Sequence, residues 1–98
     1  MSFEQALDIS LAAALGDDQA LVAELRGAFL DSARKHFRAM ADAAGDADWR
    51  DAALRLQGLA ASFGAESLMQ AAARAAESRG PDAQCLDAIE RALVVLSL

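Results

Sequence analysis

The chain is organised around one stretch, Ala53-Leu54-Arg55-Leu56-Gln57-Gly58-Leu59-Ala60-Ala61-Ser62-Phe63-Gly64-Ala65. The spacing of its apolar residues predicts the second half of a helix that begins near Asp46 and stops at Gly64. At 3.6 residues per turn, one side of this helix is wholly apolar and should face a core. That side holds Trp49, Ala52, Ala53, Leu56, Leu59, Ala60 and Phe63.

The opposite side of the helix is polar apart from a spot near its middle. Leu54 lies there, with Gly58 one turn further on and Ala61 two turns on. A large apolar side chain beside a residue that has none makes a low, apolar and exposed spot. The remaining residues of this side are Arg50, Asp51, Arg55, Gln57 and Ser62.

The stretch resembles the signature of histidine phosphotransfer (HPt) domains, which are four-helix-bundle relay modules of two-component signalling. Their pattern is roughly Ala-His-x-Leu-Lys-Gly-x-Ala-x-x-apolar-Gly-Ala, followed by Leu. The chain matches it at Ala53, Leu56, Gly58, Ala60, Phe63, Gly64, Ala65 and Leu68. Roughly residues 9–96 also follow the family's order of helices. Leu54 stands where the family has its phosphorylated histidine, and Gln57 stands where it has lysine.

These two departures fall on the residues that carry the family's chemistry. Leucine has no lone pair with which to accept a phosphoryl group, and a neutral amide replaces the neighbouring positive charge. The resemblance therefore implies no catalytic residue and a non-enzymatic adaptor that binds a response-regulator receiver domain, a histidine kinase or both. Its protein-binding residues would be Arg50, Leu54, Arg55, Gln57, Gly58, Ala61 and Ser62.

Composition and charge favour a small helical protein. The 98 residues fit one domain, 1–98, and their many alanines, single proline and absence of tyrosine favour helices over a sheet. A net charge of −6 disfavours nucleic acid and anionic membranes as partners. The single Cys85, the lack of a secretory signal and the lack of a membrane-spanning run indicate a cytoplasmic protein.

Glycine breaks and apolar periodicity predict where the helices lie. The expected fold is all-α: an up-down antiparallel four-helix bundle with a short additional N-terminal helix across it. The expected helices cover residues 2–15, 17–44, 47–63, 65–79 and 82–97. We expect Gly64 to adopt the left-handed conformation that ends a helix, and Gly27 to allow close packing against a neighbour.

Each of the other bundle helices has an apolar stripe that we expect to be buried. On helix 17–44 the stripe is Leu21, Val22, Leu25, Phe29, Ala33, His36, Phe37, Met40 and Ala44. On helix 65–79 it is Leu68, Met69, Ala72, Ala75 and Ala76. On helix 82–97 it is Cys85, Leu86, Ile89, Ala92, Leu93 and Leu96.

His36 offers an alternative, active phosphotransfer at the only histidine of the chain. Its place on an apolar stripe favours a half-buried histidine instead, because a phosphoryl acceptor must be accessible. The basic residues Arg34, Lys35 and Arg38 should form a solvated face that pairs with nearby acids.

The remaining chemistry of the sequence is sparse. Asp42, Asp46, Asp48 and Asp51 should act as caps and solubilising groups, so we expect neither a metal site nor a cofactor. A third possibility is a helical assembly or dimerisation module, because Val94 and Val95 cannot both face one core. We expect a monomer in preference to a homodimer.

Overall fold

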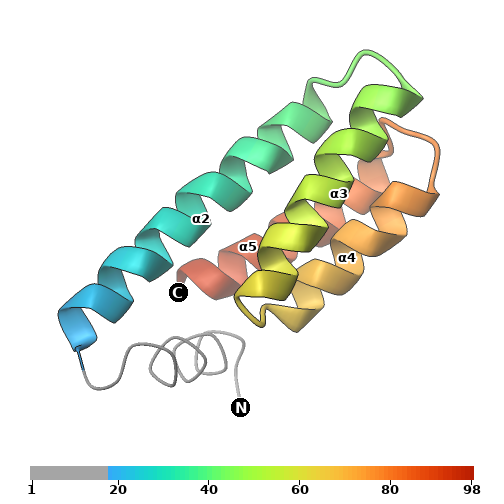
Figure 1. Cartoon of the computed structure of the whole chain (residues 1–98). Helices are drawn as coiled ribbons and strands as arrows, with labels where there is room; N and C mark the ends of the chain where they lie inside the picture. The colour runs from blue at the N-terminus through green and yellow to red at the C-terminus, as the bar shows by residue number, and fades with distance from the viewer. Residues whose placement is uncertain (1–17) are drawn as a thin grey trace.

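The computed structural model describes residues 18–98, and the helix expected at residues 2–15 lies outside them. Four helices and no strand occupy the described part of the chain (Figure 1). They are α2 (Gln19–Ala41), α3 (Asp46–Ser62), α4 (Glu66–Glu77) and α5 (Ala83–Ser97). These bounds confirm the helices expected from the sequence to within a few residues. No helix between residues 18 and 98 has the length and apolar character needed to cross a membrane.

Each of the four helices packs against two others around a shared core. α3 contacts α2 and α4, while α5 contacts α4 and α2, so the contacts form a closed ring (Figure 1). Short turns join consecutive helices, which places chain neighbours side by side. The described residues therefore form a helical bundle.

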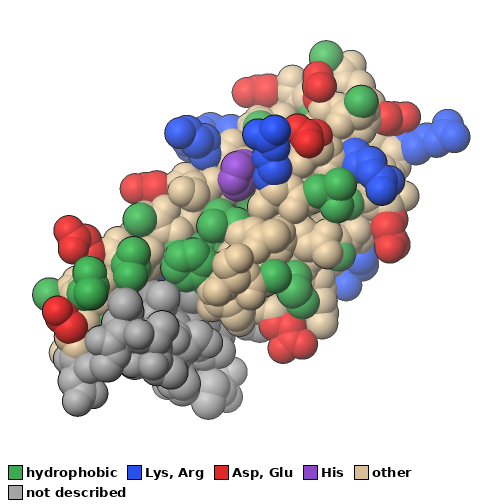
Figure 2. All heavy atoms as spheres, viewed as in Figure 1, with side chains coloured by type: hydrophobic (Ala, Val, Ile, Leu, Met, Phe, Trp, Pro, Cys, Tyr) green, Lys and Arg blue, Asp and Glu red, His purple; other side chains and the backbone are tan. Residues whose placement is uncertain are grey.

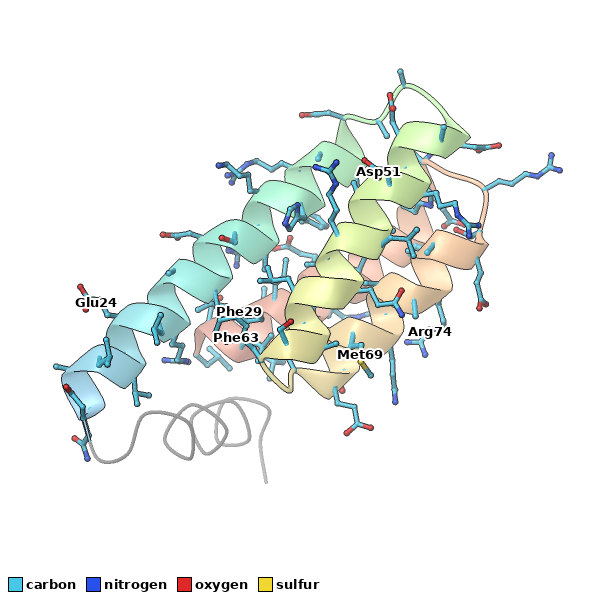
Figure 3. The ribbon with its side chains drawn as sticks, in the orientation of Figure 1. Glu24, Phe29, Asp51, Phe63, Met69 and Arg74 are labelled. Carbon is cyan, nitrogen blue, oxygen red and sulfur yellow. The ribbon has the colours of Figure 1, made fainter. Side chains whose placement is uncertain are left out.

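Large side chains fill the middle of the bundle, and alanines let the helices approach one another. Those with the most completely buried side chains are Phe29, Met40, Trp49, Leu56, Leu68, Ile89, Leu93 and Leu96. Ala33, Ala53, Ala60, Ala72 and Ala75 are fully buried between them. The ring of Phe29 in α2 contacts the ring of Phe63, the residue that follows α3, with their centroids 4.7 Å apart (Figure 3).

Two residues of the expected stripe on α2 are exposed instead of buried. Ala44 lies beyond the last residue of α2, Ala41, in the turn that leads to α3. Leu21 lies in the first turn of α2 and is 38% exposed. With 23 residues, α2 is longer than α3 with 17 and α5 with 15, so its first turn has fewer described neighbours to pack against.

Ten other residues of the apolar stripes that were expected to be buried are only half-buried. This group comprises Val22, Leu25, His36, Phe37, Leu59, Phe63, Met69, Cys85, Leu86 and Ala92. Ala65 and Ala71 are buried although the periodicity did not assign them to a stripe. The sequence therefore predicted correctly which side of each helix is buried. The width of the buried side is set by how the neighbouring helices pack against it.

The helix ends follow local sequence signals. The side chains of Asp18 and Asp82 accept hydrogen bonds from the first-turn amides of α2 and α5, at 2.9 to 3.1 Å. Gly64 has a φ of 70°, which confirms its expected left-handed conformation. Its amide donates to the carbonyl of Ala61 and the next amide donates to the carbonyl of Ala60, which closes α3 with a Schellman motif.

Two expectations about local sequence are wrong. Gly45 precedes α3 without a side-chain cap, so Asp46 and Asp48 act from the first turn, where their negative charges interact favourably with the helix dipole. Gly27 does not allow close packing against a described neighbour, because a Cβ added there would meet no described atom within 4 Å. The glycine of α2 therefore lowers helix stability without a packing benefit among the described residues.

Candidate docking face

The exposed apolar spot on α3 is centred on Leu54. Its neighbours Ala52, Ala53 and Leu56 are buried against the bundle, whereas Leu54 itself is 44% exposed. Since helical geometry turns position 54 away from the buried positions, the side chain stands on the outward face of α3. The structure thus places Leu54 at the surface, as its phase in the sequence indicated.

The surface next to Leu54 is low. A Cβ added at Gly58 would meet no described atom within 4 Å, so the space above this glycine is open. Ala61, one turn further on, is also exposed. Leu54, Gly58 and Ala61 therefore form an apolar strip along the outer face of α3, which we call the Leu54 strip.

The polar neighbours of the strip differ in whether their side chains already make hydrogen bonds within the chain. Ser62 donates its hydroxyl to the carbonyl of Gly58 at 2.9 Å, within its own helix. Gln57 is half-buried and makes no hydrogen bond with a described residue. An amide at this position is thus free to meet a partner, while the hydroxyl of Ser62 is occupied.

Two arginines flank the strip. Arg55 lies 3.2 Å from the carboxylate of Asp51, and both side chains are about two-thirds exposed. An ion pair this exposed contributes only about 0–1 kcal/mol, so a partner could displace it. Arg50 has no ion pair with any acid among residues 18–98. The strip thus carries one free and one loosely held positive charge.

His36 lies in a groove where α2 meets α3, beside Arg55. The groove has a volume of about 280 Å³, and its charged lining residues are His36, Asp42, Asp48, Asp51 and Arg55. The imidazole is partly buried, which confirms the half-buried position expected for it. Figure 2 shows the histidine at the surface of this face, with acidic and basic side chains gathered nearby.

The environment of His36 favours its neutral form. Burial lowers its pKa below the ordinary value of 6.5, and the positive charges of Arg55 and Lys35 lower it further. A neutral imidazole at pH 7 is a possible nucleophile. Three carboxylates line the same groove, however, and they would repel an approaching phosphoryl group.

The proximity of His36 and Arg55 was not anticipated from the sequence. The signal was present, because α2 and α3 are joined by the short turn at residues 42–45 and fold back on each other. Residues at similar distances from that turn must then face each other. Counting outward from the turn would have placed His36 opposite the region of Asp51 and Ala52, one turn from Arg55.

The basic residues near His36 are less paired than expected. Arg34 reaches Glu90 of α5 at 3.8 Å and the hydroxyl of Ser97 at 3.4 Å. Lys35 and Arg38 make no ion pair with an acid in the described part of the chain. Arg38 lies in the last turn of α2, where a cation stabilises the helix by interacting with the helix dipole.

Cys85 is partly buried, with its sulfur 3.5 Å from the hydroxyl of Ser78. No histidine adjoins it, because the only histidine of the chain lies in the α2–α3 groove. This environment fits a packing role for the thiol.

Comparison with known proteins identifies no relative. The chain matches no protein-family model, no curated protein and no solved structure.

The lowered pKa of His36 predicts how stability should depend on pH. The folded state takes up a proton at this site less readily than the unfolded chain, so stability is greatest above the unfolded value of 6.5. The free energy of unfolding should therefore fall as pH decreases from about 7 through 6.5 towards the folded pKa. Urea unfolding at several pH values between about 5.5 and 8 measures this slope.

The His36→Gln variant serves as the control for this slope. The aspartates titrate in both proteins, so the difference between the two curves isolates the imidazole. The variant should lose that part of the slope, which begins as pH falls through 6.5. Parallel curves for the two proteins would show that burial and the neighbouring cations do not act on His36.

Proposed function

We propose that the chain is a non-catalytic HPt-like domain of a two-component pathway, which binds a receiver domain or a histidine kinase through the Leu54 strip. The observation that supports this most directly is the exposure of Leu54 at the position where an HPt domain presents its histidine. The open space at Gly58 would let the loops of a partner approach it.

On the basis of the resemblance, we also propose a finer architecture for the chain, an up-down antiparallel bundle of the HPt type. The closed ring of contacts among α2, α3, α4 and α5 is compatible with that order. The Schellman motif at Gly64 gives the Gly-Ala pair of the family pattern a structural reason, because only glycine adopts its φ of 70° without strain.

The strip fits a moderate interaction better than a tight one. Complete burial of a leucine contributes about 1.5–3 kcal/mol, and Leu54 has less than half of its surface left to bury. About 1 kcal/mol is then available from this side chain. Arg50 and Arg55 would add ionic contacts with acidic groups of a partner, so we expect dissociation constants in the micromolar range or weaker.

The proposed role includes no phosphoryl transfer and no cofactor. Leu54 cannot hold a phosphoryl group, and Gln57 brings no charge with which to stabilise one. His36 is a weaker candidate than the adaptor role, because the carboxylates of its groove oppose an anionic donor. The domain would act in the cytoplasm, where its proposed partners meet it, as a competitor or scaffold.

The direct test is a binding titration against the receiver domains and histidine kinases of the source organism. We expect at least one of them to bind the wild-type chain, and Leu54→Arg to weaken that binding at least about tenfold, since a charge would be buried. Leu21→Arg is the matched control, because Leu21 is similarly exposed but lies on α2. If no receiver or kinase binds, or if the two variants bind equally well, docking at the Leu54 strip is wrong.

Incubation with a phosphorylated receiver domain separates the adaptor from an active relay. We expect no acid-labile phosphate on the chain under conditions that label an ordinary HPt domain. Label that appears on the wild-type chain and disappears in His36→Gln would establish phosphotransfer at His36 and end the non-catalytic proposal.

A further inference from the structure

The outer surface of α4 and α5 carries a second apolar feature, on different helices from the Leu54 strip. A shallow groove of about 240 Å³ lies between these helices, and its lining consists of short side chains and two arginines. Its lining includes Ala71 and Arg74 of α4, together with Ala88, Arg91, Ala92 and Val95 of α5. Such short side chains let another helix approach closely.

An exposed ridge borders this groove on α5. Asp87, Arg91, Val94 and Leu98 lie three or four residues apart and therefore share one face of the helix. Val94 is 46% exposed and Leu98 is 77% exposed, and they are among the few large apolar side chains at the described surface. Because Arg91 belongs to both features, the apolar ridge and the groove adjoin each other.

The charges around this surface have both signs. Arg91 is paired with Asp87 at 2.9 Å, and both side chains are highly exposed. Arg74 projects outward from α4 (Figure 3) and has no ion pair with a described acid. Glu66 and Glu77 are exposed on the same helix. The two helices thus present a ridge, a groove, an unpaired cation and unpaired acids.

We propose that this α4–α5 surface is the interface of a symmetric homodimer, in place of the monomer expected from the sequence. In a two-fold contact the same patch meets itself, so a patch needs a protruding part and a receiving part of matching character. The Val94 ridge of one copy would enter the alanine groove of the other, and Arg74 would meet an acid across the interface. The chain's net charge of −6 opposes association in general, which favours a contact surface where cations offset acids.

A dimer of ordinary size would cover a small part of the accessible surface of the chain. A standard interface buries about 800 Å² on each partner, which is about one seventh of the 5690 Å² of accessible surface. The interface would leave the Leu54 strip free, because that strip lies on α3, so the proposal does not depend on the docking function.

Sedimentation of the 98-residue chain over a concentration series tests the proposal. We expect the mass to rise from 10.2 kDa towards twice that value between roughly 1 µM and 1 mM. Val94→Glu on the ridge and Ala88→Arg in the groove should each raise the dissociation constant at least about tenfold. Leu54→Glu, on the other face, should leave it unchanged.

Circular dichroism checks that the variants fold. If Ala88→Arg does not fold, the dissociation constant of Val94→Glu alone tests the proposed interface. A wild-type chain that stays monomeric throughout the series would overturn the proposal, in agreement with the monomer expected from the sequence. A dimer that forms equally well in folded Val94→Glu would also overturn it, because another surface would then make the contact.

Discussion

Replacement of Trp49 by alanine is expected to lower the free energy of unfolding by about 3–5 kcal/mol, the usual cost of deleting a fully buried aromatic side chain. Trp49 is the largest side chain of the core and has no exposed surface. It also joins α3 to the end of α4, because its indole N–H donates to the carbonyl of Ala75 at 2.7 Å. The loss should appear as a lower urea midpoint with a similar m-value.

Trp49→Phe should separate the contribution of ring packing to stability from the contribution of the hydrogen bond. The carbonyl of Ala75 also accepts from the amide and the hydroxyl of Ser78, at 3.1 and 3.0 Å, so it keeps partners when the indole is removed. The expected cost is about 1–2 kcal/mol, from one lost hydrogen bond and a smaller ring. Equal losses for the alanine and phenylalanine variants would mean that the hydrogen bond, and not ring packing, dominates the contribution of Trp49.

Gly80→Ala is the second substitution for which we expect a large effect. A Cβ at position 80 would overlap ring carbons of Trp49, which is buried and cannot rotate away. Packing the extra methyl group into this contact should cost about 1–3 kcal/mol. Urea unfolding measures the loss, and circular dichroism should show the same helix content.

Gly27→Ala is the matched control for the methyl group. A Cβ there meets no described atom within 4 Å, and position 27 lies inside α2, so the substitution should stabilise by about 0.5–1 kcal/mol. In a Trp49→Ala background, Gly80→Ala should lose most of its cost, because the ring that it would strike is gone. Additive effects of the two substitutions would show that the cost of Gly80→Ala does not come from contact with the Trp49 ring.

Local signals explain why the helices could be predicted. Asp18 and Asp82 cap α2 and α5, and Gly64 closes α3 through a backbone conformation that other residues adopt with strain. These signals act over a few residues, so they can be recognised in the sequence without knowledge of the fold. The exposure of Leu54 is equally local, because it follows from its phase relative to Trp49, Ala53 and Leu56.

Of the two candidate sites on α3, only the groove of His36 depends on contacts between helices. Leu54, Gly58 and Ala61 lie on one helix, and periodicity alone brings them together. His36 and Arg55 come from α2 and α3, and they meet because of how those helices are turned towards each other. Periodicity gives the direction of an apolar stripe but not the rotation of a neighbouring helix, which is set by the fit of side chains across the contact.

The sequence by itself determined the four described helices, the turn at Gly64 and the outward position of Leu54, because each is set within one helix by capping, backbone conformation or phase. Only the tertiary structure decided that Gly80 lies against Trp49, that His36 shares a groove with Arg55, and that Ala71 of α4 and Ala88 of α5 line one groove. These contacts join residues far apart in the chain, and their geometry follows from packing the whole bundle at once.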